Sequence, residues 1–199
     1  MVRDLRKRCS WDRAQTRETL RPYLVEEVLE LDDALGGGDA DTIRGEVSDL
    51  LLHLAFQLVI AEERREFSPD EVAEQLERKM RRRHPHLFDL GEAVPWERIK
   101  RRERRGKTLS GIVPTLPPLL KAYRLQERAA SVGFDWPDVE GPLAKVREEL
   151  GEVERELGAG TTDRLRDEIG DLLFAVVNLA RKADVQPGPA LDRANRKFR

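Results

Sequence analysis

Apolar positions recur with a helical period along almost the whole chain. The first such segment spans about residues 16–35, although Pro22 inside it indicates either a helix start or a kink. After three glycines, a second segment extends to about Arg65 and is apolar nearly all round, which is typical of a buried helix. Ser68, followed by a proline and two acidic residues, indicates the capped start of a third helix that ends near Arg83.

The rest of the chain keeps this helical character, so the sequence predicts an all-α protein. In the second half we expect helices over about residues 119–132, 148–157 and 162–183. The first dozen residues predict a loop, and a short, very basic helix is expected from Trp96 to Arg105. Glycine and proline are frequent in residues 106–118, which indicates a linker between an N-terminal domain (1–105) and a C-terminal domain (119–199).

Five acidic residues in the first half recur in the second half, each displaced by the same 122 positions. They are Glu26, Glu27, Glu30, Glu46 and Asp49, matched by Glu148, Glu149, Glu152, Glu168 and Asp171. The glycines between the two helices keep the same register, since Gly36 and Gly38 match Gly158 and Gly160. The sequence therefore predicts two copies of one helix-turn-helix unit, each with its own acidic cluster.

The spacing of these carboxylates predicts that they face one another. Residues three or four apart share a helix face, so Glu27 projects with Glu30 and Glu46 projects with Asp49. The short glycine connection folds the two helices back antiparallel, which places the four carboxylates opposite each other. Unpaired carboxylates would repel, so the group needs a cation, and oxygen ligands favour Mg²⁺ first and Mn²⁺ second. Acids on a solvated helix face are the plainer interpretation, but the apolar character of the second helix argues against it.

Charge and cysteine content narrow the class of protein. There are 36 Lys and Arg against 38 Asp and Glu, a net charge of −2, so no overall field favours nucleic acid. The single cysteine, Cys9, excludes an internal disulfide and fits a reducing cytoplasm. The charged start has no apolar run typical of a signal peptide, and the longest apolar stretch, residues 50–61, is too short to span a bilayer. We therefore expect a cytoplasmic protein with neither a membrane nor a nucleic acid as partner.

A basic run closes the third predicted helix, from residue 78 to residue 83. Cations at a helix C-terminus favour the helix dipole, and they also suit a triphosphate on the side away from a metal, so both interpretations stay open for the run as a whole. Residues 195–199 repeat the pattern of residues 77–81, so basic residues recur where the acidic residues recur. His53 lies one turn past an acidic position, but the second copy has Ala175 there, which indicates local packing.

The combined motifs resemble those of the MazG family of nucleoside triphosphate pyrophosphohydrolases, in its tandem form and over nearly the whole chain. Beside the acidic positions, the resemblance rests on Cys9-Ser10-Trp11-Asp12, Arg82-Arg83-His84-Pro85-His86, Gly133-Phe134-Asp135-Trp136 and Asn195-Arg196-Lys197-Phe198. It implies an all-α helical bundle that assembles as a homodimer. It also implies Mg²⁺-dependent hydrolysis of nucleoside triphosphates to the monophosphate and pyrophosphate.

Carried over position by position, the resemblance implies site residues. The implied metal ligands are Glu27, Glu30, Glu46 and Asp49 in the first copy and Glu149, Glu152, Glu168 and Asp171 in the second. The family's phosphate-contacting Lys and the Arg four residues later fall on Lys79 and Arg83, and Lys197 is the matching lysine of the second copy. Ser10 stands where the family usually has proline, and Arg199 is reached before a matching arginine. We therefore expect a shortened second copy, and a first site that is at least an equal candidate for catalysis.

The mechanism that fits these residues is metal-assisted hydrolysis, with Mg²⁺ on the carboxylates activating a water. Glu26 and Glu148, next to the ligands, are candidates to orient or deprotonate that water, while Lys79 and Arg83 would steady the leaving pyrophosphate. Trp11 is interpreted either as a stacking partner for a base or as a plug in the core.

Two other classes of protein stay open. A ferritin-like di-metal redox bundle uses carboxylates on helix pairs, but it requires Glu-x-x-His pairs where this chain has Glu-x-x-Asp. A relative that keeps the fold and binds nucleotide or a partner without turnover is the non-catalytic alternative. Pyrophosphate release with Mg²⁺ that disappears in EDTA discriminates it from an enzyme.

Overall fold

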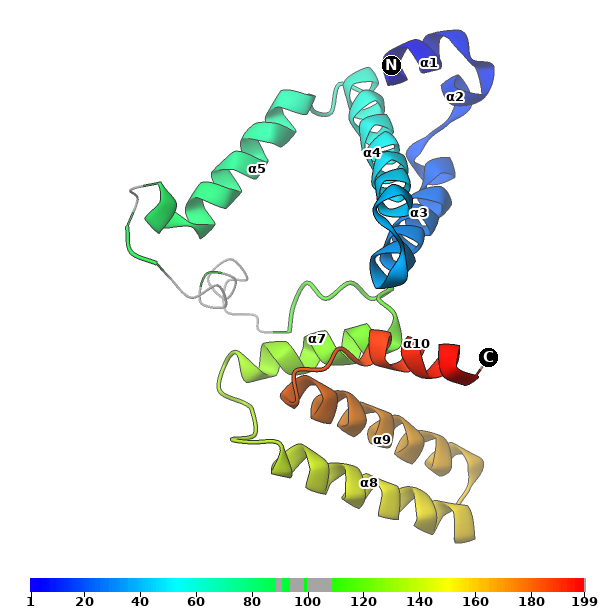
Figure 1. Ribbon diagram of the computed structural model, residues 1–199, viewed down its shortest axis with the longest axis vertical. Helices are drawn as coiled ribbons and strands as arrows, with labels where there is room; N and C mark the ends of the chain where they lie inside the picture. The colour runs from blue at the N-terminus through cyan, green and yellow to red at the C-terminus, as the bar shows by residue number, and fades with distance from the viewer. Residues whose placement is uncertain (89–90, 94–98, 100–108, 199) are drawn as a thin grey trace. The chain divides into compact units, whose positions relative to one another are not determined.

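The computed structural model describes residues 1–88, 91–93, 99 and 109–198, and every regular element in these ranges is helical. The predicted all-α class is therefore confirmed. The chain divides into two compact units, Met1–Ala93 and Val94–Arg199 (Figure 1). None of the helices in the described ranges combines the length and the apolar character needed to cross a bilayer.

Two expectations fall on parts of the chain that the structure does not describe. The basic helix expected over residues 96–105 lies outside the described residues, apart from Ile99. Residues 100–108, which span the expected boundary between the first domain and the linker, are also outside them. The predicted domain limits and linker therefore stay predictions.

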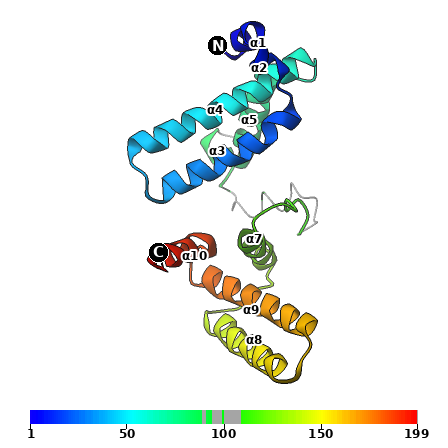
Figure 2. The same ribbon diagram turned by 90° about the vertical axis from the view of Figure 1, so that its right-hand side faces the viewer.

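The first unit is built on two long antiparallel helices. Its described helices are α1 (Val2–Arg8), α2 (Ser10–Ala14), α3 (Arg17–Gly37), α4 (Ala40–Glu63), α5 (Pro69–Arg83) and the 3-10 helix η1 (Pro85–Leu87). Figures 1 and 2 show α3 and α4 side by side, joined by a short turn, as the sequence predicts. In contrast, α5 leaves the end of α4 without lying along this pair (Figure 1).

The loop expected over the first dozen residues is wrong, because α1 and α2 occupy this segment. Arg6 donates hydrogen bonds to the carbonyl oxygens of Asp12 at 2.8 Å and Gln15 at 3.1 Å, and it pairs with Glu63 on α4 at 2.7 Å. Val2 is buried in the core against α4. Helices this short are not stable alone. Contacts with distant residues therefore hold them, and sequence periodicity does not report such contacts.

Polar side chains set the starts of the three longer helices. Thr16 caps α3, which then continues through Pro22 as one helix. The carboxylate of Asp39 caps α4. At α5, Ser68 and Glu71 form a reciprocal capping box, which confirms the start predicted from the sequence.

The hydrophobic core of the first unit lies along the C-terminal half of α4. Its buried members are Val2, Leu20, Phe56, Val59 and Ile60. The expectation that this helix is buried all round is wrong for the single chain, since Leu51 is 63% exposed and Leu54 is 49% exposed. The reason is that α3 and α1 pack on α4 but leave much of both leucine side chains exposed.

The second unit contains a second antiparallel pair with two further helices against it. Its described helices are α7 (Pro118–Ala130), α8 (Glu140–Ala159), α9 (Thr162–Lys182) and α10 (Pro187–Phe198). Figure 2 shows α8 beside α9 at one end of this unit, with α7 and α10 at the other side of α9. The basic C-terminal segment expected from the repeat lies on α10.

The helix α8 begins eight residues before the expected start at Glu148. Its first turn contains Pro142, which a first helical turn tolerates because no backbone N–H is needed there. The ring of Trp136 packs on Gly141 so closely that an added Cβ would lie 2.3 Å from a ring carbon. The side chain of Trp136 therefore packs on this early turn, a contact that the spacing of apolar residues does not reveal.

Candidate metal centres

The first acidic cluster lies between α3 and α4. One carboxylate oxygen from each of Glu27, Glu46 and Asp49 lies within 4.8 Å of the others. Glu27 comes from α3 and the other two come from α4, where a spacing of three puts them on one face. The folding of these two helices against each other therefore brings together three of the four carboxylates that the sequence paired.

Glu30, the fourth carboxylate predicted here, lies at the edge of this cluster. Among the described residues it is not a member of the 4.8 Å group. Partial loss of water raises the pKa of the Glu30 carboxyl, and the negative charges of Glu27, Glu46 and Glu26 raise it further. Like charges that raise one another's pKa are relieved by a bound cation. Glu30 and Glu26 thus belong to the same electrostatic site.

The second acidic cluster lies between α8 and α9. One carboxylate oxygen from each of Glu149, Glu152 and Glu168 lies within 4.8 Å of the others, while Asp171 is outside this group of described residues. Partial loss of water raises the pKa of the Glu168 carboxyl, and the neighbouring Glu152 and Asp171 raise it further. The repeated sequence register thus gives each helix pair an acidic cluster, although the three closest members differ.

Glu149 is the most buried carboxylate of the two clusters, with 5% of its surface exposed. Its Oε2 atom is buried and has no hydrogen-bond partner among the described residues. Its Oε1 atom lies 2.6 Å from Nζ of Lys145, which also lies 2.9 Å from Oε1 of Glu148. Hydrogen bonds to these two carboxylates raise the pKa of the Lys145 ammonium. A buried carboxylate oxygen without a partner, beside two other carboxylates, is what a hard divalent ion would satisfy.

The remaining predicted residues lie on other elements. Lys79 and Arg83 are four positions apart on α5, hence on one face of that helix, and both are partly buried. Trp11 lies on α2 with 56% of its surface exposed, so it is not a plug in the core of this unit. Lys197 is exposed near the end of α10. The structure thus gathers the acids, whereas the basic residues stand on separate helices.

His53 lies beside the first cluster without joining it. Its Nε2 atom is 3.6 Å from Oε1 of Glu27, and its Nδ1 atom is buried without a hydrogen-bond partner among the described residues. His53 is not a member of the 4.8 Å ligand group. His53 is therefore placed to contact Glu27, a predicted ligand, and not to bind the metal itself.

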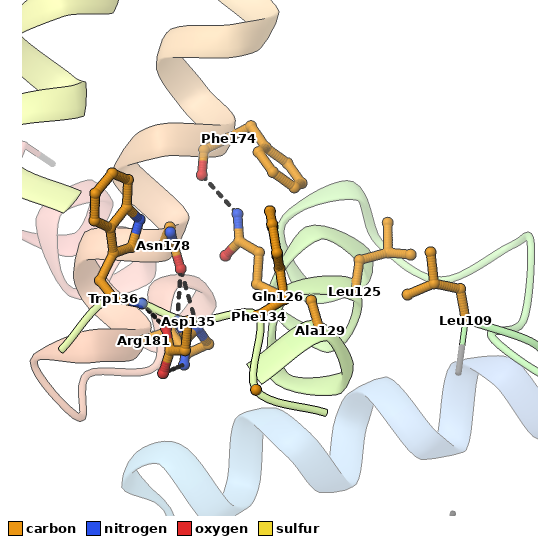
Figure 3. Close-up of a pocket in the computed structure, with 11 residues that line it drawn as sticks. Leu109, Leu125, Gln126, Ala129, Phe134, Asp135, Trp136, Phe174, Asn178 and Arg181 are labelled. Carbon is orange, nitrogen blue, oxygen red and sulfur yellow. Dashed lines mark hydrogen bonds and ion pairs between the residues drawn. The ribbon is translucent and has the colours of Figure 1, made fainter. Parts of the chain in front are cut away.

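A pocket of about 610 Å³ lies in the second unit, next to α9. It is lined by Leu109, Leu125, Gln126, Ala129, Gly133, Phe134, Asp135, Trp136, Phe174, Asn178 and Arg181. The amide nitrogen of Gln126 donates to the backbone oxygen of Phe174 at 2.8 Å, while its Oε1 atom is buried without a partner among the described residues. Figure 3 shows Asp135 and Arg181, which form an ion pair, on the opposite side of the pocket from Leu109 and Leu125.

The pocket and the second cluster share the helix α9. Asn178 lies seven residues after Asp171, which puts both on the same face about 10 Å apart along the axis. The sequence reasoning did not single out Gln126, Phe174 or Asn178. Their polar or aromatic character alone does not mark a pocket, because the walls come from separate segments.

Lys145 was also missed by the sequence reasoning. The available signal was its spacing of four from Glu149, which places both side chains on one helix face. A second signal was the repeat itself, because the matching residue of the first copy is Tyr23. A departure from a repeat is most informative where it changes the charge beside a shared site.

Comparison with known proteins agrees with the division of the chain into two copies. The family described as the MazG nucleotide pyrophosphohydrolase domain matches residues 15–88 and 139–199, together more than half of the chain. A nucleoside triphosphate pyrophosphohydrolase/pyrophosphatase MazG of Thermotoga maritima is 42% identical over 196 residues, covering 96% of this chain and 76% of that protein. A nucleoside triphosphate pyrophosphohydrolase of Escherichia coli K12 is 40% identical over 210 residues, and the match covers 99% of this chain and 80% of that protein. An uncharacterized protein YabN of Bacillus subtilis is 39% identical over 212 residues, and the match covers 100% of this chain but 43% of YabN.

Proposed function

This chain belongs to the MazG nucleotide pyrophosphohydrolase family, and we propose that it hydrolyses nucleoside triphosphates to the nucleoside monophosphate and pyrophosphate. The observation that carries this proposal is the gathering of three carboxylates from two helices within 4.8 Å, once in each unit. Such groups hold the hard cations that accompany phosphate chemistry. The unpartnered, buried Oε2 of Glu149 supports the same conclusion for the second unit.

Mg²⁺ is the ion we propose, with Mn²⁺ as a substitute, because every donor in the two clusters is a carboxylate oxygen. The ligands would be Glu27, Glu30, Glu46 and Asp49 in the first centre and Glu149, Glu152, Glu168 and Asp171 in the second. When bound there, such an ion supplies a Lewis acid that neutralises phosphate charge and lowers the pKa of a coordinated water.

The chain's own residues would orient the substrate and accept the proton of the attacking water. Glu26 and Glu148 adjoin the proposed ligands and are suited to accept a proton from the attacking water. Lys79 and Arg83 would bind the departing pyrophosphate through charge-assisted hydrogen bonds. In the second copy Lys197 would take the part of Lys79, and the exposed ring of Trp11 offers a stacking surface in the first.

We also propose a homodimer, because the single chain leaves the first site incomplete. The helix α5, which carries Lys79 and Arg83, does not lie along its own α3–α4 pair (Figure 1). The apolar side chains of Leu51 and Leu54 on α4 are largely exposed. A second copy that packs on this surface would bury them and could bring a basic helix toward the acidic cluster.

The base is proposed to enter the pocket beside α9. Apolar and aromatic walls with a few placed polar groups suit a heterocyclic ring. The buried, unpartnered Oε1 of Gln126 would accept a hydrogen bond from a ring N–H or an amino group. Phe174 and Asn178, which line this pocket, lie three and seven residues after Asp171 on α9, so one nucleotide can reach both the pocket and the metal centre.

The test is release of pyrophosphate from a panel of nucleoside triphosphates in Mg²⁺, with and without EDTA. We expect activity in the wild-type protein, loss in EDTA, and a fall of about 100-fold or more when the working copy carries Glu46→Gln or Glu168→Gln. Loss in one variant alone identifies the working copy. Nucleotide binding without pyrophosphate release in the wild-type protein would instead favour a non-catalytic relative.

A further inference from the structure

Two basic side chains form ion pairs with carboxylates of the second acidic cluster. Lys145 lies 2.6 Å from Glu149, and Arg155 lies 2.9 Å from Oε1 of Glu152. Both basic residues belong to α8, the helix that carries these two carboxylates. The pair with Arg155 is largely exposed, so its contribution is small. The pair with Lys145 differs, because it holds a carboxylate with 6% of its side chain exposed.

The first cluster lacks these cations. The matching positions, 122 residues earlier, are Tyr23 and Asp33. Among the described residues no Lys or Arg forms an ion pair with Glu27, Glu46 or Asp49, and Glu27 instead faces His53. The two copies therefore repeat their carboxylates but not the charges beside them.

We propose that Lys145 is a resident counter-ion of the second cluster that competes with divalent metal for Glu149, so that the second centre binds metal more weakly than the first. This inference rests on the proposed function, because it takes both clusters to be metal centres. The substrate-free protein would then load its first centre at low metal concentration and its second centre at a higher one. The metal occupancy of the two centres would thus respond to different concentrations of free metal.

The environment of Glu149 explains why this position needs a cation at all times. A carboxylate removed from water is strongly destabilising unless it is paired. One oxygen is satisfied by Lys145 and the other has no partner among the described residues. A metal ion can displace Lys145 from Glu149, since 42% of the lysine side chain is exposed and its flexible stem can carry the ammonium back into water. Metal and ammonium thus contend for one buried charge.

The experiment measures binding of Mn²⁺ alone to the full chain by calorimetry, with one centre disabled at a time. In a Glu46→Gln background, which leaves the second centre, we expect Lys145→Met to tighten Mn²⁺ binding about tenfold, as removal of one nearby positive charge requires. Lys145→Arg keeps the charge and should keep the weaker affinity. Lys121→Met, on α7, removes a lysine of the same unit away from the cluster and should change nothing.

The reciprocal exchange tests the first centre. In a Glu168→Gln background, Tyr23→Lys places an ammonium four residues before Glu27, as Lys145 stands before Glu149. We expect Mn²⁺ binding there to weaken about tenfold. The parent proteins themselves should show the order of affinities, with the first centre tighter than the second.

A second readout does not depend on metal affinity. In EDTA, Lys145→Met leaves Glu149 without its cation, so the melting temperature should fall, and saturating Mn²⁺ should restore it. Affinity that is unchanged or weaker in Lys145→Met would overturn the inference while leaving the metal centres in place. Absence of Mn²⁺ binding in both parents would overturn the centres as well, so the two failures are distinguishable.

Discussion

Glu168 on α9 faces Glu152 on α8, and loss of water together with this neighbouring carboxylate raises the pKa of the Glu168 carboxyl above its ordinary value. The two residues come from different helices, so their closeness is a product of the helix pair. Without metal, the charged form of Glu168 is the unfavourable one. The folded protein therefore binds a proton there more readily than the unfolded chain does.

This relationship predicts how the metal-free protein responds to pH. A raised carboxyl pKa means that Glu168 favours folding below that pKa and opposes it as pH rises through it toward neutrality. Glu168→Gln should therefore raise the melting temperature in EDTA at neutral pH, and the gain should shrink on acidification. Thermal melts across this pH range measure it. Glu154→Gln, an exposed acid on α8, is the control, and an equal effect in both variants would contradict the prediction.

Addition of Mg²⁺ should stabilise the protein through both centres. A ligand at 100 times its dissociation constant contributes about 2.7 kcal/mol per site to the free energy of unfolding. Glu46→Gln and Glu168→Gln should each remove one part of this gain, and the double variant should remove both. Urea unfolding with Mg²⁺ or EDTA is the measurement. A double variant that still gains stability from Mg²⁺ would place the ion elsewhere.

Substitutions of two leucines should distinguish the core of the first unit from its exposed apolar surface. Leu20 is 1% exposed, so Leu20→Ala should cost about 2–5 kcal/mol of unfolding free energy. Leu51 is 63% exposed, so Leu51→Ala should cost less than about 0.5 kcal/mol in the isolated chain. Unfolding measured at low and high protein concentration tests both values. A cost at Leu51 that grows with concentration would support the proposed homodimer.

The ion pair between Asp135 and Arg181 should stabilise the wall of the pocket. The hydrogen bond from Arg181 lowers the pKa of the Asp135 carboxyl, so this group favours folding at neutral pH and its contribution is lost as pH falls through that lowered pKa. Asp135→Asn should cost about 1–3 kcal/mol at neutral pH. The difference from the wild-type protein should vanish in acid. Asp192→Asn, exposed on α10, is the matched control.

Gln126 should affect recognition of the base more than the chemical step. Gln126→Leu removes the buried acceptor and should raise KM about tenfold for nucleotides whose base donates to it, with kcat changed less. Kinetics on the nucleotide panel measure this split. Gln186→Leu, exposed before α10, controls for the substitution itself. If kcat alone fell, and fell equally for every nucleotide, the proposal that the base binds in this pocket would be contradicted.

The sequence by itself determined the class of fold and the pairing of the acids. The helical period and the caps at Thr16 and Ser68 depend on neighbouring residues, so they are readable without a structure. The spacing of three between Glu27 and Glu30 fixes a shared face for the same reason. The constant register between the two halves then predicted two helix pairs with one acidic cluster each, and the structure has both.

The tertiary structure alone decided what surrounds each cluster. The burial of Glu149, the exposure of Leu51 and the pocket at Gln126 each depend on which helix packs on which. The helices at the N-terminus are likewise held by contacts with residues far away in sequence, such as the ion pair between Arg6 and Glu63 and the burial of Val2 in the core against α4. Burial and charge compensation arise from contacts between distant segments, and a local pattern carries no information about them.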